Sequence, residues 1–381
     1  MDSEDKPKNK KRRPLRSMFA ILLIAALAYV AIAYISGRQS EMLGAFDILS
    51  RLQAIEMADE FDFDIGRSRV FANIDKSIAA VGTLGIQVLR ADGTELLRDS
   101  CRMTNPSICA QNGRAVAYDI GGTAIRIFSE KEIIASIEAN GSINSVTINR
   151  NGWISVCTQD SQSYKGVATV YDKQGIPVYK VNMASGYILT AALSPDNSSL
   201  AVLGLAGEGS KVTVYSLDSE DVDRIFALPG ELLLDIRYLS GGEVLAISTE
   251  SLFLINKRNE MDTLFEFDQG RLGGFILNPD ITILHIYDQN AGYRGRVLSI
   301  DKTGRIYGEA AIDREIVSMS MESGYLSIML TDSALFFNSL MEQVPLAQEL
   351  FLAAGATKIL SLRKGTALLA GDHFAYSIKT A

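Results

Sequence analysis

Short apolar runs separated by turn residues recur along most of the chain. The stretch 188–228 holds four such runs, at 188–193, 200–205, 212–216 and 225–228, with segments rich in Ser, Asp and Gly between them. Runs of this length, rich in β-branched residues and bounded by turn formers, are typical of antiparallel strands joined by short turns. The pattern therefore predicts a four-stranded β-meander.

This meander repeats through the chain. Aligning the repeats on their third strands gives anchor positions 38–45 residues apart, at Ile86, Ile125, Ala168, Val212, Leu252, Val297, Leu335 and Phe374. A four-stranded unit of about 40–45 residues is the repeat of a β-propeller. We therefore expect an all-β, eight-bladed propeller over residues 60–381. A seven-bladed ring is the alternative if one unit is misread, and the seventh unit is the weakest, because residues 338–350 make a poor strand.

The two ends of the propeller region complement each other. The last unit supplies only three strands, whereas the alternating segment 61–65, Phe-Asp-Phe-Asp-Ile, has no unit of its own. Pairing the two would cover both open sheet edges, which folded proteins avoid exposing. We predict that strand 61–65 closes the ring by joining the C-terminal blade.

The chain begins with a different pattern. Residues 1–17 form a basic segment expected to be disordered and cytoplasmic, and residues 18–36 form an uncharged apolar run. An 18-residue helix spans roughly 27 Å, close to the ~30 Å hydrocarbon core of a bilayer. Residues 37–59 have apolar positions at helical spacing and predict a short juxtamembrane helix.

The basic residues precede the apolar run, so the positive-inside rule places the N-terminus in the cytoplasm and the propeller outside the cell. The expected location is the cell membrane, crossed once. The alternative is a signal peptide cleaved near Ala33, because Ala31-Ile32-Ala33 has the A-x-A pattern. The apolar run continues past that site and is long for a signal peptide, which favours the retained anchor.

One short motif has a recognisable likeness. Asn105-Pro106, the run Tyr118-Asp-Ile-Gly-Gly122 and Arg126-Ile-Phe-Ser resemble a family of Gram-positive bacterial membrane proteins of unknown function. Members pair one N-terminal transmembrane helix with an extracytoplasmic β-propeller. The resemblance implies this architecture and location for nearly the whole chain. It implies no reaction and no functional residues.

Composition limits the chemistry. Residues 1–17 carry a net charge of +4, so the remaining 364 carry −12, and an acidic body argues against nucleic acid as a partner. The two histidines, His285 and His373, lie in different units and suggest no shared site. We identify no metal site and no catalytic motif, and we expect no cofactor: the single Trp153 argues against a quinone-cofactor propeller, which uses a Trp in each blade.

The three cysteines are too few for a disulfide scaffold. Cys101 and Cys109 lie close in sequence and would be able to form a disulfide outside the cell, but Cys109 would equally fit a core as a small apolar side chain. Cys157 is expected to be a core residue.

Loop length is the most informative difference between the units. The loops between second and third strands are short except at 158–166, 206–211 and 288–295, and we expect these three to share one rim of the disc. They carry Tyr164, Lys165, Tyr293 and Arg294, residue types suited to binding. A solvated and variable set of loops is the alternative interpretation.

These patterns favour a non-catalytic, membrane-anchored binding or scaffold module of the bacterial cell envelope, which recognises an envelope protein, a peptide or a cell-wall glycan through that rim. The alternative is an extracytoplasmic hydrolase or lyase acting on carbohydrate with carboxylates in the propeller channel. A converging pair of buried carboxyl groups would favour the enzyme. Signalling into the cell is disfavoured because the 17-residue cytoplasmic segment is too short to hold a domain.

Overall fold

The computed structural model describes residues 60–379, except 62, 91–92, 160–163, 184–185, 208, 220, 259, 269, 289–293, 346–355, 363–364 and 372–374. The segments 1–17, 18–36 and 37–59 therefore lie outside the described residues, as does His373. In the part of the chain that is described, we find no helix long and apolar enough to cross a membrane.

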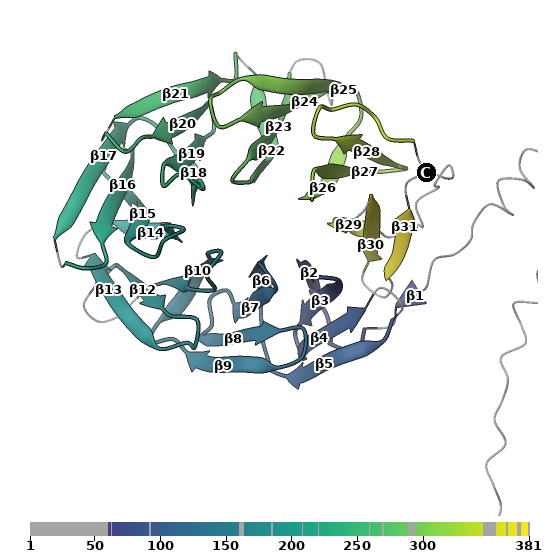
Figure 1. The fold of residues 1–381 in the computed structure, drawn as a ribbon, viewed down its shortest axis with the longest axis horizontal. Helices are drawn as coiled ribbons and strands as arrows, with labels where there is room; N and C mark the ends of the chain where they lie inside the picture. Colours follow the sequence, from purple (N-terminus) through teal and green to yellow (C-terminus); the bar gives the residue numbers. More distant parts are fainter. Residues whose placement is uncertain are drawn as a thin grey trace, which may run out of the picture. The chain divides into compact units, whose positions relative to one another are not determined.

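The described residues form a ring of eight antiparallel sheets around a central opening (Figure 1). Each sheet is one blade, and seven of the eight have four described strands. The expected eight-bladed β-propeller is confirmed, and the seven-bladed alternative is wrong. Seven of the eight predicted anchors lie in the third strand of their blade, and the eighth, Phe374, is outside the described residues, immediately before that strand.

The first strand of each blade lines the opening (Figure 1). In chain order these inner strands are β2 (Val70–Ile74), β6 (Pro106–Gln111), β10 (Ser142–Ile148), β14 (Tyr187–Leu193), β18 (Leu233–Tyr238), β22 (Arg271–Leu277), β26 (Ile316–Glu322) and β29 (Ala356–Leu362).

The second and third strands form the middle of each blade, and the two adjacent blades pack against their faces. Most of their side chains are apolar. The second strands are β3 (Ser77–Gly82), β7 (Arg114–Asp119), β11 (Ile154–Gln159), β15 (Ser199–Ala206), β19 (Val244–Ser248), β23 (Ile281–Tyr287), β27 (Tyr325–Leu330) and β30 (Thr366–Gly371). The third strands are β4 (Gly85–Arg90), β8 (Ala124–Ser129), β12 (Gly166–Tyr171), β16 (Gly209–Ser216), β20 (Ser251–Ile255), β24 (Gly295–Asp301), β28 (Ala334–Asn338) and β31 (Ala375–Lys379).

The outer strands alternate between exposed and half-buried side chains, because one of their edges faces solvent. These strands are β5 (Glu95–Ser100), β9 (Ile133–Glu138), β13 (Pro177–Met183), β17 (Val222–Pro229), β21 (Met261–Glu266) and β25 (Ile306–Ile312). Blade 7 has three described strands, and residues 346–350 of the segment predicted to be a poor strand lie outside the described residues.

The ring closes where its two ends meet. Strand β1 (Glu60–Phe61) pairs antiparallel with β31 and completes blade 8. The closing strand is shorter than the predicted 61–65, because residues 63 and 65 leave the ladder and bury their side chains instead. Phe63 and Ile65 pack with residues of both blade 8 and blade 1.

Among the described residues, the hydrophobic core consists of eight separate clusters. Each cluster contains buried residues from two adjacent blades, and together the clusters pass once around the ring. Every blade is therefore apolar on both faces. This explains why the sequences of its middle strands are continuous apolar runs rather than an alternation of apolar and polar residues.

The motif behind the family resemblance has a structural role. The Asp119 carboxylate accepts hydrogen bonds from the backbone N–H groups of Thr104 (2.9 Å) and Asn105 (2.6 Å). Asn105 in turn donates from its side chain to the Ile120 carbonyl (3.2 Å). Gly122 lies so close that an added Cβ would be 2.3 Å from the Asp119 carboxylate. These residues fasten the start of β6 to the end of β7.

Candidate functional site

The two faces of the ring carry different connections. Because all strands within a blade are antiparallel, the loops between second and third strands open on the same face as the connections between blades. We call this the long-loop face. The hairpins that join first to second and third to fourth strands open on the opposite face, the hairpin face.

Three of the four predicted binding residues are described, and they lie on the long-loop face. Tyr164 is 39% exposed, and the Lys165 ammonium nitrogen lies 5.7 Å from the centroid of the Tyr187 ring, within the range of a cation–π contact. Arg294 is exposed. Tyr293 lies outside the described residues. Blades 4 and 5 separate the loop of blade 3 from that of blade 6, so the structure does not bring Lys165 and Arg294 together.

One of the three predicted long loops is a tight turn. Strands β15 and β16 stay paired as far as Ala206 and Gly209, which leaves two residues between them. The prediction of a long loop at 206–211 is wrong because these two strands have eight residues each and continue into the segment that we interpreted as a loop.

The long-loop face also exposes large apolar side chains that the loop comparison did not find. Those at the strand ends and connections of this face are Leu84, Ile120, Tyr164, Tyr187, Leu232, Leu234 and Val317, which are 38–55% exposed. Tyr164, Tyr187, Leu232 and Leu234 lie on the consecutive blades 3, 4 and 5. We call these four residues the apolar arc.

The hairpin face contains a pocket at the end of the channel. Its volume is about 310 Å³, and its walls come from the inner strands of blades 2 to 5, the hairpins that follow them and Pro279 in the corresponding hairpin of blade 6. A second pocket of about 380 Å³ lies beside it, against blades 1, 2, 6 and 7. Arg237 and Gln111 line both pockets.

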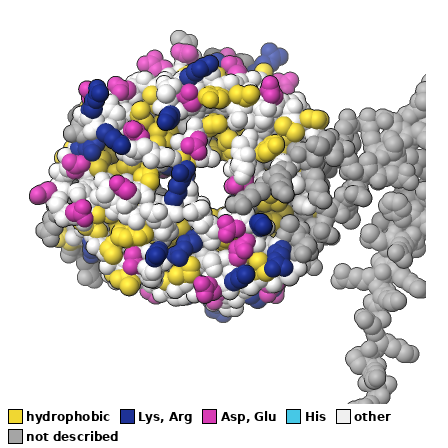
Figure 2. Space-filling view, in the orientation of Figure 1, with side chains coloured by type: hydrophobic (Ala, Val, Ile, Leu, Met, Phe, Trp, Pro, Cys, Tyr) yellow, Lys and Arg dark blue, Asp and Glu magenta, His cyan; other side chains and the backbone are white. Residues whose placement is uncertain are grey.

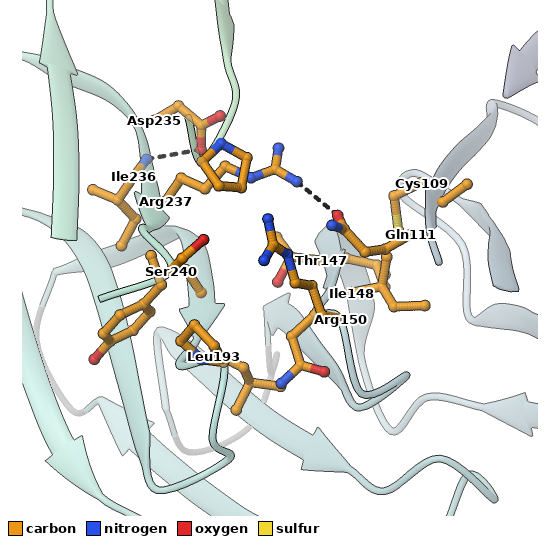
Figure 3. Close-up of a pocket in the computed structure, with 17 residues that line it drawn as sticks. Cys109, Gln111, Thr147, Ile148, Arg150, Leu193, Asp235, Ile236, Arg237 and Ser240 are labelled. Carbon is orange, nitrogen blue, oxygen red and sulfur yellow. Dashed lines mark hydrogen bonds between the residues drawn. The ribbon is translucent and has the colours of Figure 1, made fainter. Parts of the chain in front are cut away.

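Arg237 reaches across part of the ring (Figure 3). It alternates on β18 with the buried Ile236 and Tyr238, which directs its side chain into the channel. Its guanidinium donates to the Leu277 carbonyl of blade 6 (3.0 Å) and to Gln111 Oε1 of blade 2 (3.0 Å). Arg237 is thus held by two other blades, and its hydrogen bond to Gln111 separates the two pockets.

Arg150 extends into the first pocket toward this hydrogen bond (Figure 3). Its backbone is held from both neighbouring blades: its carbonyl accepts from Asn112 (3.2 Å), and the preceding Asn149 donates to the Ser194 carbonyl (2.9 Å). The Asn149 side-chain oxygen also accepts from the Asn151 and Trp153 amides, which fixes the turn. The Arg150 guanidinium makes no hydrogen bond or ion pair with any residue that the structure describes.

The pocket is lined by more positively than negatively charged side chains. Burial lowers the pKa of Arg237, and the nearby positive charge of Arg150 lowers it further, whereas Asp235 acts in the opposite sense. Burial raises the pKa of Asp235, whose carboxylate accepts from the Ile236 amide at 2.8 Å. Asp235 forms no ion pair with either arginine in the described structure. Two guanidinium groups therefore share a pocket with one poorly solvated carboxylate. In the view of Figure 2, basic side chains also lie at the edge of the central opening.

The cysteines do not form a disulfide, so the candidate bridge between Cys101 and Cys109 is not present. Cys101 packs between blades 1 and 2, whereas Cys109 packs against the cluster between blades 2 and 3. Their side chains thus lie on opposite sides of blade 2. Burial raises the pKa of Cys109 and of Cys157 to about 12.

Two features bear on the alternative enzymatic function. Among the described residues, no group of three or more His, Cys, Asp or Glu is arranged to hold a metal ion. The second pocket contains two carboxylates, of which Asp75 is exposed and Glu322 half-buried. They are not the buried converging pair that would favour glycoside cleavage. His285 lies within β23, and burial lowers its pKa.

The pocket residues Arg150, Asp235 and Arg237 were not predicted from the sequence. A signal for two of them exists: Asp235 and Arg237 alternate with apolar residues in the first strand of a unit, which faces the channel. Arg150 gives no such signal, because an arginine in a hairpin is ordinarily a solvated surface residue.

The model of a family of unknown function, DUF5711, matches residues 50–339. No curated protein sequence matches the chain.

Solved structures share the fold. BamB from Moraxella catarrhalis has a TM-score of 0.54 at 12% identity, covering 85% of this chain and 99% of that one. Apo AztD from Citrobacter koseri has a TM-score of 0.52 at 12% identity, covering 80% and 90%. The β-propeller domain of Cps50 (Swd1) from Myceliophteria thermophila has a TM-score of 0.50 at 10% identity, covering 72% and 95%. At these identities the likeness establishes the propeller fold alone.

Proposed function

The chain belongs to the DUF5711 family of unknown function, and we propose that it is a membrane-anchored binding module of the cell envelope that recognises a protein partner through its long-loop face. In this proposal residues 18–36 cross the membrane once, residues 1–17 lie in the cytoplasm and the propeller lies outside the cell. The proposal names no reaction.

The apolar arc is the observation that carries the binding role. Tyr187 is 49% exposed, Leu232 46% and Leu234 38%, and they lie on adjacent blades of one face. Exposed apolar groups that gather on one face of a soluble domain mark interaction surfaces more often than scattered ones do. Tyrosine also contributes strongly to protein interfaces, because its ring buries a large area at a small entropic cost. Lys165 beside Tyr187 adds a charged group of the kind found at an interface rim.

The proposed location rests on the sequence of the first 36 residues and is tested by labelling. The described cysteines are buried or half-buried, so an introduced cysteine would report on its own position. Lys302 is exposed in the turn between β24 and β25. We expect a membrane-impermeant maleimide to label K302C in intact cells and to label S3C only after the membrane is permeabilised. The reverse pattern would exclude the proposed orientation.

The proposed partner face is tested by crosslinking in intact cells. A photoreactive amino acid at Tyr187 or Leu232 would sample the apolar arc. The same amino acid at Ile176 or Ile225, each 58% exposed, would sample apolar positions away from this face. We expect one discrete protein adduct from the arc positions and none from the controls.

A paired substitution completes that test. The variant Y187S/L232S should lose co-purification of the crosslinked protein, whereas I176S/I225S should retain it. Both pairs remove exposed side chains, so both proteins should have the wild-type melting temperature. Identical adducts from arc and control positions, or capture that survives Y187S/L232S, would exclude this face as the binding surface.

A further inference from the structure

The pocket at the hairpin face has features that the proposed partner surface does not explain. It lies at the opposite end of the channel from the apolar arc, and it gathers residues of blades 2 to 6. A ligand in this pocket would not touch the long-loop face, so ligand binding here is independent of the proposed protein partner.

The pocket presents fixed positive charge. Arg237 is held by the Leu277 carbonyl and by Gln111, so its guanidinium is oriented before any ligand arrives. A side chain that is already ordered loses little entropy on binding. Arg237 uses two of its nitrogens for these two hydrogen bonds, and its remaining N–H groups are available to an acceptor.

Arg150 supplies the second charge from a different direction. It comes from the hairpin of blade 3, whereas Arg237 comes from the inner strand of blade 5. Like charges that share a pocket repel each other, and the effect of Arg150 in lowering the pKa of Arg237 reflects this repulsion. Of the described residues that line the pocket, Asp235 alone carries a carboxylate. An anion between the two guanidinium groups would remove the repulsion and satisfy both.

The chemistry of the lining selects the kind of anion. A planar carboxylate matches the fork of one arginine, whereas a tetrahedral phosphoryl group has oxygens in more than one plane and can accept from two arginines that approach from different sides. Its double negative charge also matches two guanidinium charges. Ser240 at the rim provides a hydroxyl, and Leu193, Pro195 and Pro279 provide apolar wall.

The volume allows more than the anion alone. A pocket of about 310 Å³ is at the lower end of the ~300–1,000 Å³ range of small-molecule sites. We propose that this pocket binds a small ligand through a phosphoryl group held between Arg150 and Arg237, with the carbon skeleton of the ligand against the apolar wall.

The test compares arginine variants of the full-length protein. Isothermal titration would measure binding of inorganic phosphate and of glycerol 3-phosphate, with acetate at equal ionic strength as the planar-anion comparison. The key variant is R150Q, because the Arg150 side chain makes no hydrogen bond to the described residues and its loss should leave folding intact. The matched control is R90Q, which removes another exposed arginine, at the end of β4 and outside the lining of the pocket.

We expect saturable binding of both phosphates to the wild type and to R90Q, and at least a tenfold loss of affinity in R150Q, since a charge-assisted hydrogen bond is worth a factor of ten or more. R150K should lose part of the affinity because it keeps the charge without the planar fork. Three results would overturn the proposal: no saturable binding by the wild type, equal losses in R150Q and R90Q, or acetate binding as tightly as phosphate.

Discussion

The closure of the ring by the N-terminal segment leads to a quantitative prediction. Ile65 is 1% exposed and packs between blades 8 and 1, although it lies outside their strands, in the segment between β1 and β2. Its backbone carbonyl also accepts from the Leu84 amide at 2.9 Å. Replacing Ile65 with alanine would remove three buried carbons from the seam where the two ends of the ring meet.

The magnitude is set by burial. Three carbons at about 0.8 kcal/mol each lower the free energy of unfolding by about 2.4 kcal/mol, and incomplete collapse of the resulting cavity raises the loss to about 3–4 kcal/mol. An unfolding entropy of about 2.1 cal/mol/K per residue, applied to the propeller, converts this loss into a decrease of about 4–6 °C in melting temperature.

The assay is calorimetry of the wild type, I65A and I154A. Ile154 is also fully buried, but it lies between blades 2 and 3, so I154A controls for loss of core volume away from the seam. Both variants should lower the melting temperature by similar amounts. Amide hydrogen exchange should separate them, because I65A should speed exchange in β30 and β31 while I154A should speed it in β7 and β11.

One result would refute the reasoning. If I65A melts within 1 °C of the wild type and exchange in blade 8 is unchanged, the segment after β1 does not hold the seam. The closure would then depend on the two residue pairs of β1 with β31.

The buried cysteines, one turn asparagine and His285 allow three more tests. Because burial raises the pKa of Cys109 and Cys157 to about 12 and Cys101 is also buried, iodoacetamide at pH 8 should label none of the three cysteines in the native protein and all three in urea; native labelling, or a disulfide detected by mass, would contradict the packing. N149A should lower the unfolding free energy by about 1–3 kcal/mol in urea titration, because it removes the side-chain hydrogen bonds of Asn149 to the Ser194 carbonyl and to the Asn151 and Trp153 amides, whereas N151A at the exposed tip of the same turn should cost less. The pKa of His285 is lowered by burial, so the unfolded state binds its proton first as the pH falls below about 6.5, and H285F should lose less stability between pH 7.5 and pH 5 than the wild type; an identical loss in both proteins would show that His285 does not contribute.

The hairpin turns could be predicted from local sequence only in part. Asp172 and Asp301 were recognised in equivalent places because Gly175 and Gly304 follow them. In both turns the aspartate Oδ1 accepts backbone amides two and four residues further on. Asn256 and Asn338 make the same pair of hydrogen bonds in blades 5 and 7. These were not recognised, because no glycine stands at the fourth position to mark them.

Most residues of the two proposed binding sites could not be predicted from local sequence alone. Tyr164 and Lys165 were found from loop length, but Tyr187 begins strand β14 and Leu232 lies in a connection of ordinary length. They become part of one surface only because blades 3, 4 and 5 are consecutive around the ring. The Arg237–Gln111 hydrogen bond joins residues 126 positions apart, and no periodicity in the sequence relates them.

By itself, the sequence determined the architecture. Strand length, turn chemistry and a repeat of 38–45 residues are local properties, so they specify the blades and, by their number, an eight-bladed ring. Tertiary structure alone decided which side chains meet. Curving eight sheets around an axis brings the ends of distant inner strands together, which places Arg150 and Arg237 in one pocket and turns Cys101 and Cys109 to opposite sides of blade 2. The physical reason is that a repeat fixes each blade relative to its neighbours, whereas contacts across the channel depend on the closure of the whole ring.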